Sequence, residues 1–365
     1  MEINGDDIIF LFGAGASVDA NIPISNQMVR HIERLIYEKE EWQEYRDLYY
    51  YLKSSIHYSD GIFGRFDEAF NVEKLLIVIS EIEKRDKNIM YPFIGAWNTR
   101  LIDLAGANFQ NISNLQKLIR RQLNEWVRIK NYDNASYYEA FDSLSGDIAE
   151  TIKVFTLNYD LCFERVVGKR RTIETGFNKG TKDWHYSNFD NSEGKHFFLY
   201  KLHGSIDWYI DGSKLFISDD PVEHPELIFG IQHKMTSVDP YFFYSSKLRE
   251  ACLNEARLIV IIGYSFADDY VNIIFSQALK SKPNVRLLSV EPIWNADVNE
   301  KRKFISKKLS LDSIDQIIVE DASAKKFMTE IMNKDYFISQ LHEPDDVPFK
   351  DEVLIDPVQN VQDVL

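Results

Sequence analysis

Short, uninterrupted runs of apolar residues recur along the chain, and this feature restricts the possible fold more than any other. The runs are rich in β-branched residues and lie at 7–12, 153–157, 197–202, 258–262 and 285–290. Because neighbouring positions are all apolar, each run is typical of a strand buried on both faces in a parallel sheet. Helical patterns separate several of the runs. We therefore predict an α/β protein with a Rossmann-like, doubly wound parallel sheet.

The interval between the first two runs has a different pattern. Residues 25–147 are helix-periodic and poor in strand signals, which predicts a large inserted helical domain. Residues 1–24 and 148–335 would then form the Rossmann-like core. Residues 336–365 are predicted to form an acidic C-terminal tail, in which Pro344, Pro348 and Pro357 oppose a regular helix.

The charge balance limits the classes of partner. The chain has 42 Lys and Arg against 57 Asp and Glu, a formal net charge of −15. Binding to a nucleic acid depends on clustered basic residues, so no direct nucleic-acid binding is expected. A dinucleotide remains compatible with this charge, because backbone N–H groups can hold its phosphates.

Other features favour a cytoplasmic protein. No apolar run approaches the roughly 20 residues that span a bilayer, and the N-terminal residues carry acids where a secretory signal would carry bases. The cysteines are Cys162 and Cys252 alone. Two cysteines without a CxxC pair exclude a zinc site built from cysteines, and no metal is expected.

A glycine-containing motif follows the first apolar run. Gly13-Ala14-Gly15-Ala16-Ser17 stands between a predicted strand and a predicted helix, where glycines allow a sharp turn and a close approach to a pyrophosphate. Val18 occupies the place of the third glycine of a GxGxxG motif. The motif is therefore compatible with a nucleotide loop or with a structural turn.

Polar residues also follow each of the later runs. Because the carboxyl ends of parallel strands meet at one edge of a sheet, these residues are expected to border one crevice. Alternatives remain for single positions, since Asn and Asp often cap helices and a histidine or a strand-end glutamate is often structural. The candidates are Asn158 and Asp160 in Thr156-Leu157-Asn158-Tyr159-Asp160, His203 in Leu202-His203-Gly204-Ser205, Gly263 and Ser265 in Gly263-Tyr264-Ser265-Phe266-Ala267-Asp268, and Glu291 in Ser289-Val290-Glu291-Pro292.

The ordered set of motifs resembles the sirtuin superfamily, and in particular the sirtuin-like domains of bacterial antiphage defence proteins. GAGAS followed by Ile22-Pro23 resembles the opening phosphate motif, TLNYD the Thr-x-Asn-x-Asp motif, LHGS the catalytic His-Gly, and GYSF and SVEP the later nucleotide-contacting segments. Phe70-Asn71-Val72-Glu73 resembles a segment of the helical part of the defence proteins. Ile24-Ser25-Asn26 replaces the Asp-Phe-Arg of the family's deacylases, and their zinc-binding cysteines are absent.

The resemblance implies an NAD+ hydrolase that releases nicotinamide and ADP-ribose, depletes NAD in antiphage defence and needs no metal. By this resemblance His203 is the general base, Asn158 holds the water or ribose, and Asp160 orients the carboxamide or stabilises the site. Gly13, Ala14, Gly15 and Ser17 would cradle the phosphates, and Gly263, Ser265 and Glu291 would contact the adenosine ribose.

The resemblance also bears on assembly. It implies a HerA-type ATPase as partner. A homo-oligomer is expected because an unregulated NAD+ hydrolase would drain its own cell, and no membrane association is expected because no apolar run is long enough to span a bilayer. The alternatives are a sensor subunit that binds NAD or ADP-ribose without cleaving it, and a protein deacylase.

Overall fold

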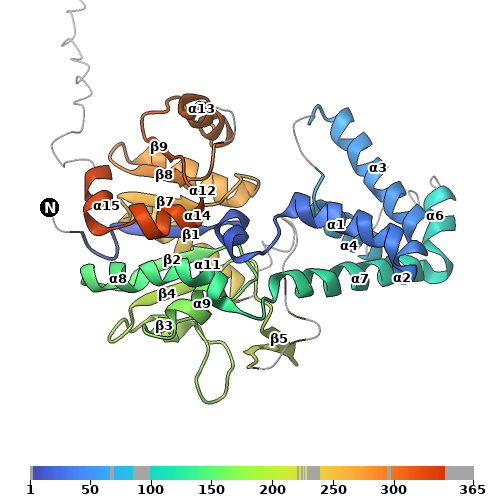
Figure 1. The fold of residues 1–365 in the computed structure, drawn as a ribbon, viewed down its shortest axis with the longest axis horizontal. Coiled ribbons are helices and arrows are strands. Elements are labelled where there is room, and N and C mark those ends of the chain that lie inside the picture. The colour runs from blue at the N-terminus through green and yellow to red at the C-terminus, as the bar shows by residue number, and fades with distance from the viewer. Residues whose placement is uncertain are drawn as a thin grey trace, which may run out of the picture.

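A seven-stranded parallel sheet forms the centre of the molecule (Figure 1). The computed structural model describes residues 3–65, 70–84, 99–219, 239–293 and 297–341, together with residues 222, 225 and 227. The strand order is β3-β4-β2-β1-β7-β8-β9, and every neighbouring pair is parallel. The strands are β1 (Ile8–Phe12), β2 (Ile152–Thr156), β3 (Ile173–Glu174), β4 (Phe197–Lys201), β7 (Leu258–Ile262), β8 (Arg286–Val290) and β9 (Ile317–Glu320).

The strand order confirms the predicted doubly wound fold. From β1 the chain moves outwards through β2 to β4, then crosses to β7 and moves outwards again through β8 to β9. Apart from the edge strand β3, this is the strand order of the Rossmann fold, which reverses direction between β1 and β7. All five predicted strands are present, whereas the short edge strands β3 and β9 were not predicted.

Helices cover both faces of the sheet, as the continuous apolar strands require. Phe10 and Phe12 of β1 belong to one core cluster, whereas Ile9 and Leu11 belong to the other. The first face is covered by η1 (Ala14–Ala20), η5 (Tyr132–Glu139), α8 (Ala140–Asp147), α9 (Cys162–Val167), α14 (Ala324–Lys326), η8 (Phe327–Ile331) and α15 (Lys334–Gln340). The second face is covered by α11 (Tyr241–Glu250), η7 (Ala251–Glu255), α12 (Asp269–Ser281) and α13 (Val298–Lys308).

The predicted insertion contains a helical lobe beside the sheet (Figure 1). Its elements are α1 (Ser25–Glu38), α2 (Glu40–Gln43), α3 (Arg46–Ile62), α4 (Val72–Glu83), α6 (Thr99–Ala105), η4 (Ala107–Phe109) and α7 (Gln110–Val127). Buried side chains recur on α7 at Ile112, Leu115, Ile119 and Leu123, a spacing that places them on one helix face. Such a face needs a partner, and the other helices of the lobe supply it.

The end of the predicted insertion and the start of the predicted tail pack on the sheet and not on the helical lobe. Residues 132–147, predicted as part of the insertion, lie on the sheet. There the ring centroid of Phe141 is 5.0 Å from that of Phe10 and 5.6 Å from that of Phe12. Helix α15 includes the first residues of the predicted tail, and its Phe337 contacts Phe10 at 5.6 Å. Residues 342–365 lie outside the described part of the chain. The domain limits themselves stay predictions.

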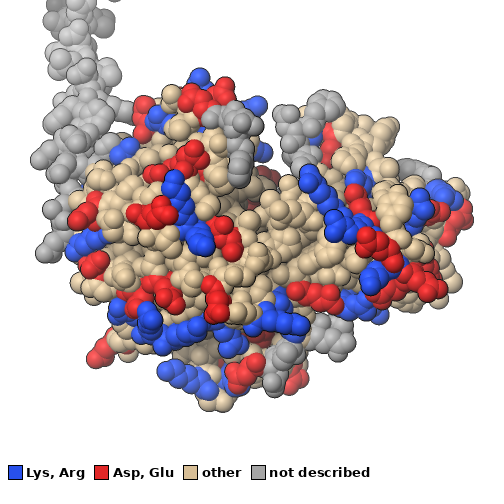
Figure 2. Space-filling model, in the orientation of Figure 1, with Lys and Arg blue, Asp and Glu red and all other residues tan. Residues whose placement is uncertain are grey.

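A small antiparallel hairpin and a mixed surface complete the described structure. The hairpin pairs β5 (Trp208–Asp211) with β6 (Lys214–Ile217), directly after the histidine motif. Figure 2 shows acidic and basic residues interspersed over both lobes of one face, with Lys and Arg also gathered along the lower margin of the sheet-containing lobe. Among the described residues, no helix combines the length and hydropathy needed to cross a bilayer.

Candidate functional site

The predicted site residues lie at the carboxyl edge of the sheet. The last residue of β1, Phe12, is in register with Thr156 of β2 and Ile262 of β7, and Thr156 is in register with Lys201 of β4. The hydrogen-bond ladder continues past the strand ends, because Leu157 N–H donates to the Phe12 carbonyl over 2.9 Å. The loops after these strands therefore start side by side, where the strand order reverses.

The glycine loop after β1 is interlocked with the loop after β7. Gly15 N–H donates to the Gly263 carbonyl over 2.8 Å, and Gly13 N–H donates to the Ile262 carbonyl over 3.0 Å. A Cβ at Gly13 would lie 2.6 Å from the Gly263 oxygen, and one at Gly15 would lie 2.7 Å from the Gly263 Cα. The close approach of two backbones thus requires both glycines, which supports the structural-turn alternative. Phosphate binding by this loop stays a prediction.

Gly263 is the most constrained residue of this contact. Its φ is +67°, and an added Cβ would lie 2.3 Å from the backbone nitrogen of Ala16. We expect Gly263→Ala to lower the free energy of unfolding by at least about 2 kcal/mol, because the left-handed region alone costs a side-chain-bearing residue about 1–2 kcal/mol. Urea denaturation measures this loss. The matched control is Gly180→Ala, where nothing lies within 4 Å of the added Cβ; an equal loss there would contradict the assignment.

Ser17, Asn158 and Asp160 form one hydrogen-bonded cluster. Ser17 Oγ donates to Asp160 Oδ2 over 2.8 Å. Asn158 Nδ2 donates to the Gly13 carbonyl over 2.9 Å and lies 3.2 Å from Ser17 Oγ. Ser17 is 1% exposed and Asp160 6%, whereas Asn158 is half-buried. The cluster joins the loops after β1 and β2, and of its three side chains that of Asn158 is the most accessible.

Asp160 is held from several directions. Its Oδ1 accepts the backbone N–H of Cys162 over 2.9 Å, at the start of α9, and its carbonyl accepts a hydrogen bond from Lys201 Nζ. The bond from the Cys162 N–H agrees with the turn alternative for Asp160, which stands one residue before the N-cap Leu161 of α9. These contacts also fix the position of Asn158 two residues earlier.

Lys201, at the end of β4, is a buried cation that the sequence analysis missed. It is 2% exposed, and its Nζ lies 2.8 Å from Glu164 Oε1 of α9. Burial alone lowers the pKa of an ammonium, but the charges of Glu164, Asp207 and Asp160 outweigh that effect and raise the pKa of Lys201 above its ordinary value. A lysine within an apolar strand pattern, two residues before His203, was the available signal.

His203 is paired with a carboxylate that the sequence analysis did not assign. His203 Nε2 lies 3.0 Å from Asp268 Oδ2, and the side chain of each residue is 6% exposed. Asp268 precedes α12 and caps its first turn. Asp268 is the last residue of the Gly263–Asp268 motif, and an Asp before a helical pattern is typical of a cap, so the sequence contained no sign of this pairing.

The two remaining candidates lie at later strand ends. Ser265 is exposed in the loop after β7. Glu291 follows β8, where it accepts a hydrogen bond from Ser289 Oγ over 3.1 Å and forms a 2.6 Å ion pair with Lys301 of α13. This ion pair supports a structural reading of Glu291, and the ribose-contact roles of both residues stay predictions.

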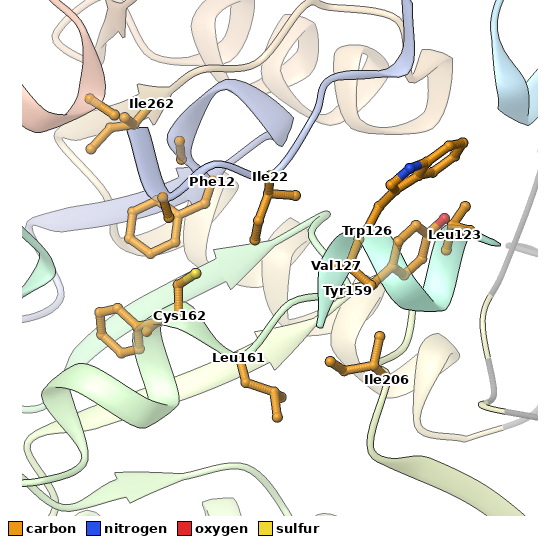
Figure 3. Close-up of a cluster of buried hydrophobic side chains, with 14 of the residues drawn as sticks. Phe12, Ile22, Leu123, Trp126, Val127, Tyr159, Leu161, Cys162, Ile206 and Ile262 are labelled. Carbon is orange, nitrogen blue, oxygen red and sulfur yellow. The ribbon is translucent and has the colours of Figure 1, made fainter. Parts of the chain in front are cut away.

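The helical lobe packs on the same loops. Figure 3 shows Leu123, Trp126 and Val127 of α7 close to Tyr159 and Ile206. Tyr159 is the neighbour of Asn158 in the sequence, and Ile206 lies three residues after His203. From the other end of the insertion, Tyr137 OH of η5 donates to the Ala16 carbonyl over 2.6 Å. The lobe and η5 therefore help to fix the loops at the carboxyl edge, which the strand-end motifs alone did not indicate.

Metal ligands are not grouped in the described part of the chain. No set of three or more His, Cys, Asp or Glu residues there is arranged to hold a metal ion. Cys162 and Cys252 are both buried and free, and burial raises the pKa of each thiol. Neither cysteine is thereby poised as a nucleophile.

Fold and site together define a doubly wound α/β protein with a buried histidine–carboxylate pair and a Ser–Asn–Asp cluster at the strand-order reversal. Residues 152–312 match a family model described as a SIR2-like domain. The matched span begins at β2 and contains Asn158, Asp160, His203 and Asp268, but not the glycine loop after β1.

The chain is also similar to solved structures, at low sequence identity. A Sir2 homologue–NAD complex has 10% sequence identity and a TM-score of 0.41, with 88% of this chain and 86% of that chain covered. A mutant Sir2 homologue in complex with 2'-O-acetyl ADP ribose has 12% identity and a TM-score of 0.39, with 88% of each chain covered. No curated protein matches the chain.

Proposed function

We propose that this chain is an NAD+ hydrolase that cleaves the bond between nicotinamide and ribose. The pairing of His203 with Asp268, at the strand-order reversal of a SIR2-like domain, is the observation that carries the proposal. In open α/β sheets this crevice is the usual place for a ligand. The neutral imidazole of a histidine there can accept a proton, so His203 is suited to act as a general base.

Two acceptor atoms of the site have no protein partner among the described residues. His203 uses Nε2 towards Asp268, and Asn158 uses Nδ2 towards Gly13 and Ser17. Within the described ranges, His203 Nδ1 and Asn158 Oδ1 have no hydrogen-bond partner. Both atoms can therefore accept a hydrogen bond from the attacking water or a ribose hydroxyl.

The proposed reaction needs one base and good positioning. The C1'–N bond breaks, its electron pair returns to the pyridinium nitrogen, and nicotinamide leaves as a neutral molecule. A water oxygen forms the new bond to C1', and His203 accepts the proton that this water loses. The products are nicotinamide, ADP-ribose and a proton. Because the leaving nitrogen is positively charged at the start, no general acid is required to protonate it.

The direct test is to incubate the purified full chain with NAD and follow nicotinamide release by chromatography. The test is repeated with a HerA-type ATPase and with a chelator. We expect release of nicotinamide and ADP-ribose, unaffected by the chelator. Binding of NAD without any release under these conditions would favour the sensor alternative, and release only in the presence of an acylated peptide would favour the deacylase.

Asn158 provides a second test of the site. We expect Asn158→Ala to lower the rate of nicotinamide release at least tenfold and also to weaken NAD binding, because the change removes a positioning acceptor and the amide that joins two loops. Steady-state kinetics and calorimetric titration with NAD measure the two effects. Asn131→Ala, at an exposed helix cap, is the control. Wild-type kinetics in the Asn158 variant would remove this residue from the site.

The biological setting is proposed on the sirtuin-like resemblance alone. We propose that the enzyme depletes NAD in the cytoplasm during antiphage defence, and that it acts as a homo-oligomer with a HerA-type ATPase partner. Particle mass by light scattering, measured alone and with the ATPase, tests the assembly. A monomer that never binds the ATPase would contradict it.

A further inference from the structure

The strongest feature beyond the proposed reaction is the way Asp268 is held against His203. Asp268 Oδ2 lies 3.0 Å from His203 Nε2, while its other oxygen, Oδ1, accepts the backbone N–H groups of Tyr270 and Val271 over 3.1 and 3.4 Å. The two oxygens of one carboxylate thus have separate tasks. Oδ1 caps the N-terminus of α12, and Oδ2 faces the imidazole of His203.

The backbone of Asp268 is fixed as well. Its N–H donates to Tyr264 OH over 3.1 Å, and its carbonyl lies 3.0 Å from the same hydroxyl. Tyr264 is 5% exposed and follows Gly263, the residue interlocked with the glycine loop. The side chain of Asp268 therefore cannot turn away from His203 without loss of the helix cap, and its backbone cannot shift without loss of the Tyr264 contacts.

We propose that Asp268 is the positioning residue of this site and makes Nδ1 of His203 the proton-accepting atom. A carboxylate accepts a hydrogen bond and has none to donate, so the neutral imidazole must carry its proton on Nε2. The lone pair then lies on Nδ1, the nitrogen without a protein partner in the described structure. The inference rests on the proposed function for its catalytic meaning, but the tautomer of His203 is a property of the free protein.

The amide variant Asp268→Asn gives a sharp test. Because one side-chain oxygen is still needed to accept the N–H groups of Tyr270 and Val271, the new NH2 group must occupy the place of Oδ2. It then donates to His203 Nε2, which forces the proton onto Nδ1. Asn is as good a helix cap as Asp, so α12 keeps its first turn. The variant therefore reverses the tautomer while it preserves the fold.

The tautomer is read by NMR on protein with 15N-labelled histidine, near neutral pH and without NAD. The His203 signals are assigned from their loss in His203→Gln, since the chain has eight histidines. We expect a protonated Nε2 and an unprotonated Nδ1 in the wild type, and the reverse in Asp268→Asn. Asp268→Ser, which keeps a capping oxygen but is too short to reach the ring, should show a mixture. An unchanged His203 tautomer in both variants would overturn the proposal.

The kinetic consequence separates positioning from a purely structural role. We expect Asp268→Asn to lower kcat for nicotinamide release by about 10²-fold, within the range that a positioned general base contributes, with KM changed less than about twofold. The control is Asp269→Asn, which removes the same charge from the next, exposed residue of α12; its kcat should stay within about twofold of wild type. An Asp268→Asn enzyme with the wild-type kcat would refute the catalytic part.

The two proposals fail in distinguishable ways. If the wild-type protein releases no nicotinamide under any condition but shows the predicted tautomer change, the proposed hydrolase is wrong and the positioning of His203 by Asp268 stands. If nicotinamide is released but the tautomer is the same in wild type and Asp268→Asn, the hydrolase stands and the role of Asp268 is wrong.

Discussion

Replacement of His203 by alanine is expected to lower the rate of NAD cleavage by about 10²- to 10⁴-fold, the contribution of a positioned general base. The loss should appear in kcat, while NAD affinity changes little, because the phosphate-binding candidates belong to other loops. Folding should persist, since Asp268 keeps its hydrogen bonds to the N-terminus of α12. Nicotinamide release and NAD titration on the same preparation measure both quantities.

His196 offers a matched control for His203. It immediately precedes β4, whereas His203 follows the end of that strand, so the two imidazoles stand at opposite edges of the sheet. His196→Ala removes an acceptor of the Thr172 N–H and should leave kcat within about twofold of wild type. Equal turnover in the His203 and His196 variants would remove His203 from the mechanism.

Replacement of Lys201 by methionine is expected to have the largest effect on stability. Lys201 is 2% exposed, and its loss would leave the carboxylate of Glu164 without its buried cation. Removal of one partner from a fully buried ion pair typically costs 3–5 kcal/mol. Because the Glu164 side chain is 22% exposed, we expect a loss of about 3 kcal/mol in the free energy of unfolding, at the lower end of that range. Urea denaturation of both proteins at pH 7 measures it.

The pH dependence of this effect follows from the sign of the shift. The pKa of Lys201 is raised in the folded protein by Glu164, Asp207 and Asp160, against the effect of burial. A raised lysine pKa contributes stability that is fully present below the ordinary lysine pKa of about 10.4 and is lost as the pH rises through the folded value. The difference between wild type and Lys201→Met should therefore persist at neutral pH and diminish in strong alkali, as Lys201 loses its proton. It should also diminish in acid, as Glu164, whose pKa is raised by burial, takes up a proton.

Lys153 is the control for Lys201 on the adjacent strand. It contacts Asp6 and Glu255, but its side chain is 15% exposed and lies nearer the opposite edge of the sheet. Partial access to water weakens such pairs, so Lys153→Met should cost about 1 kcal/mol. Similar losses in the two variants would show that burial does not set the strength of the Lys201 pairs.

Several features of the site follow from patterns that are local in sequence. The runs at 7–12 and 258–262 are apolar at every position, and only a strand covered on both faces buries all of these side chains. The residues after such strands must reach a common edge, which is why Asn158, Asp160, His203 and Gly263 were found together. Strands β3 and β9 were not predicted, because β3 has two residues and β9 is only partly buried.

The contacts that define the chemistry are not local. Asp268 stands 65 residues after His203 and has the sequence appearance of a helix cap, which it also is. The glycines at 13 and 15 resemble a phosphate loop, yet their missing side chains make room for the backbone of Gly263. In both cases the contacting residue belongs to a segment far away in the sequence. A local pattern in one segment does not reveal which distant residue will pack against it.

The amino-acid sequence by itself determined the class of fold, the main strands, and the edge at which the polar motifs meet, because hydrophobic periodicity and strand direction act over a few residues. Only the tertiary structure decided that Asp268 faces His203, that Lys201 is buried beside Glu164, and that residues 132–147 cover the sheet although they follow the helical lobe. These outcomes depend on which side chains are brought together and removed from water when distant segments pack.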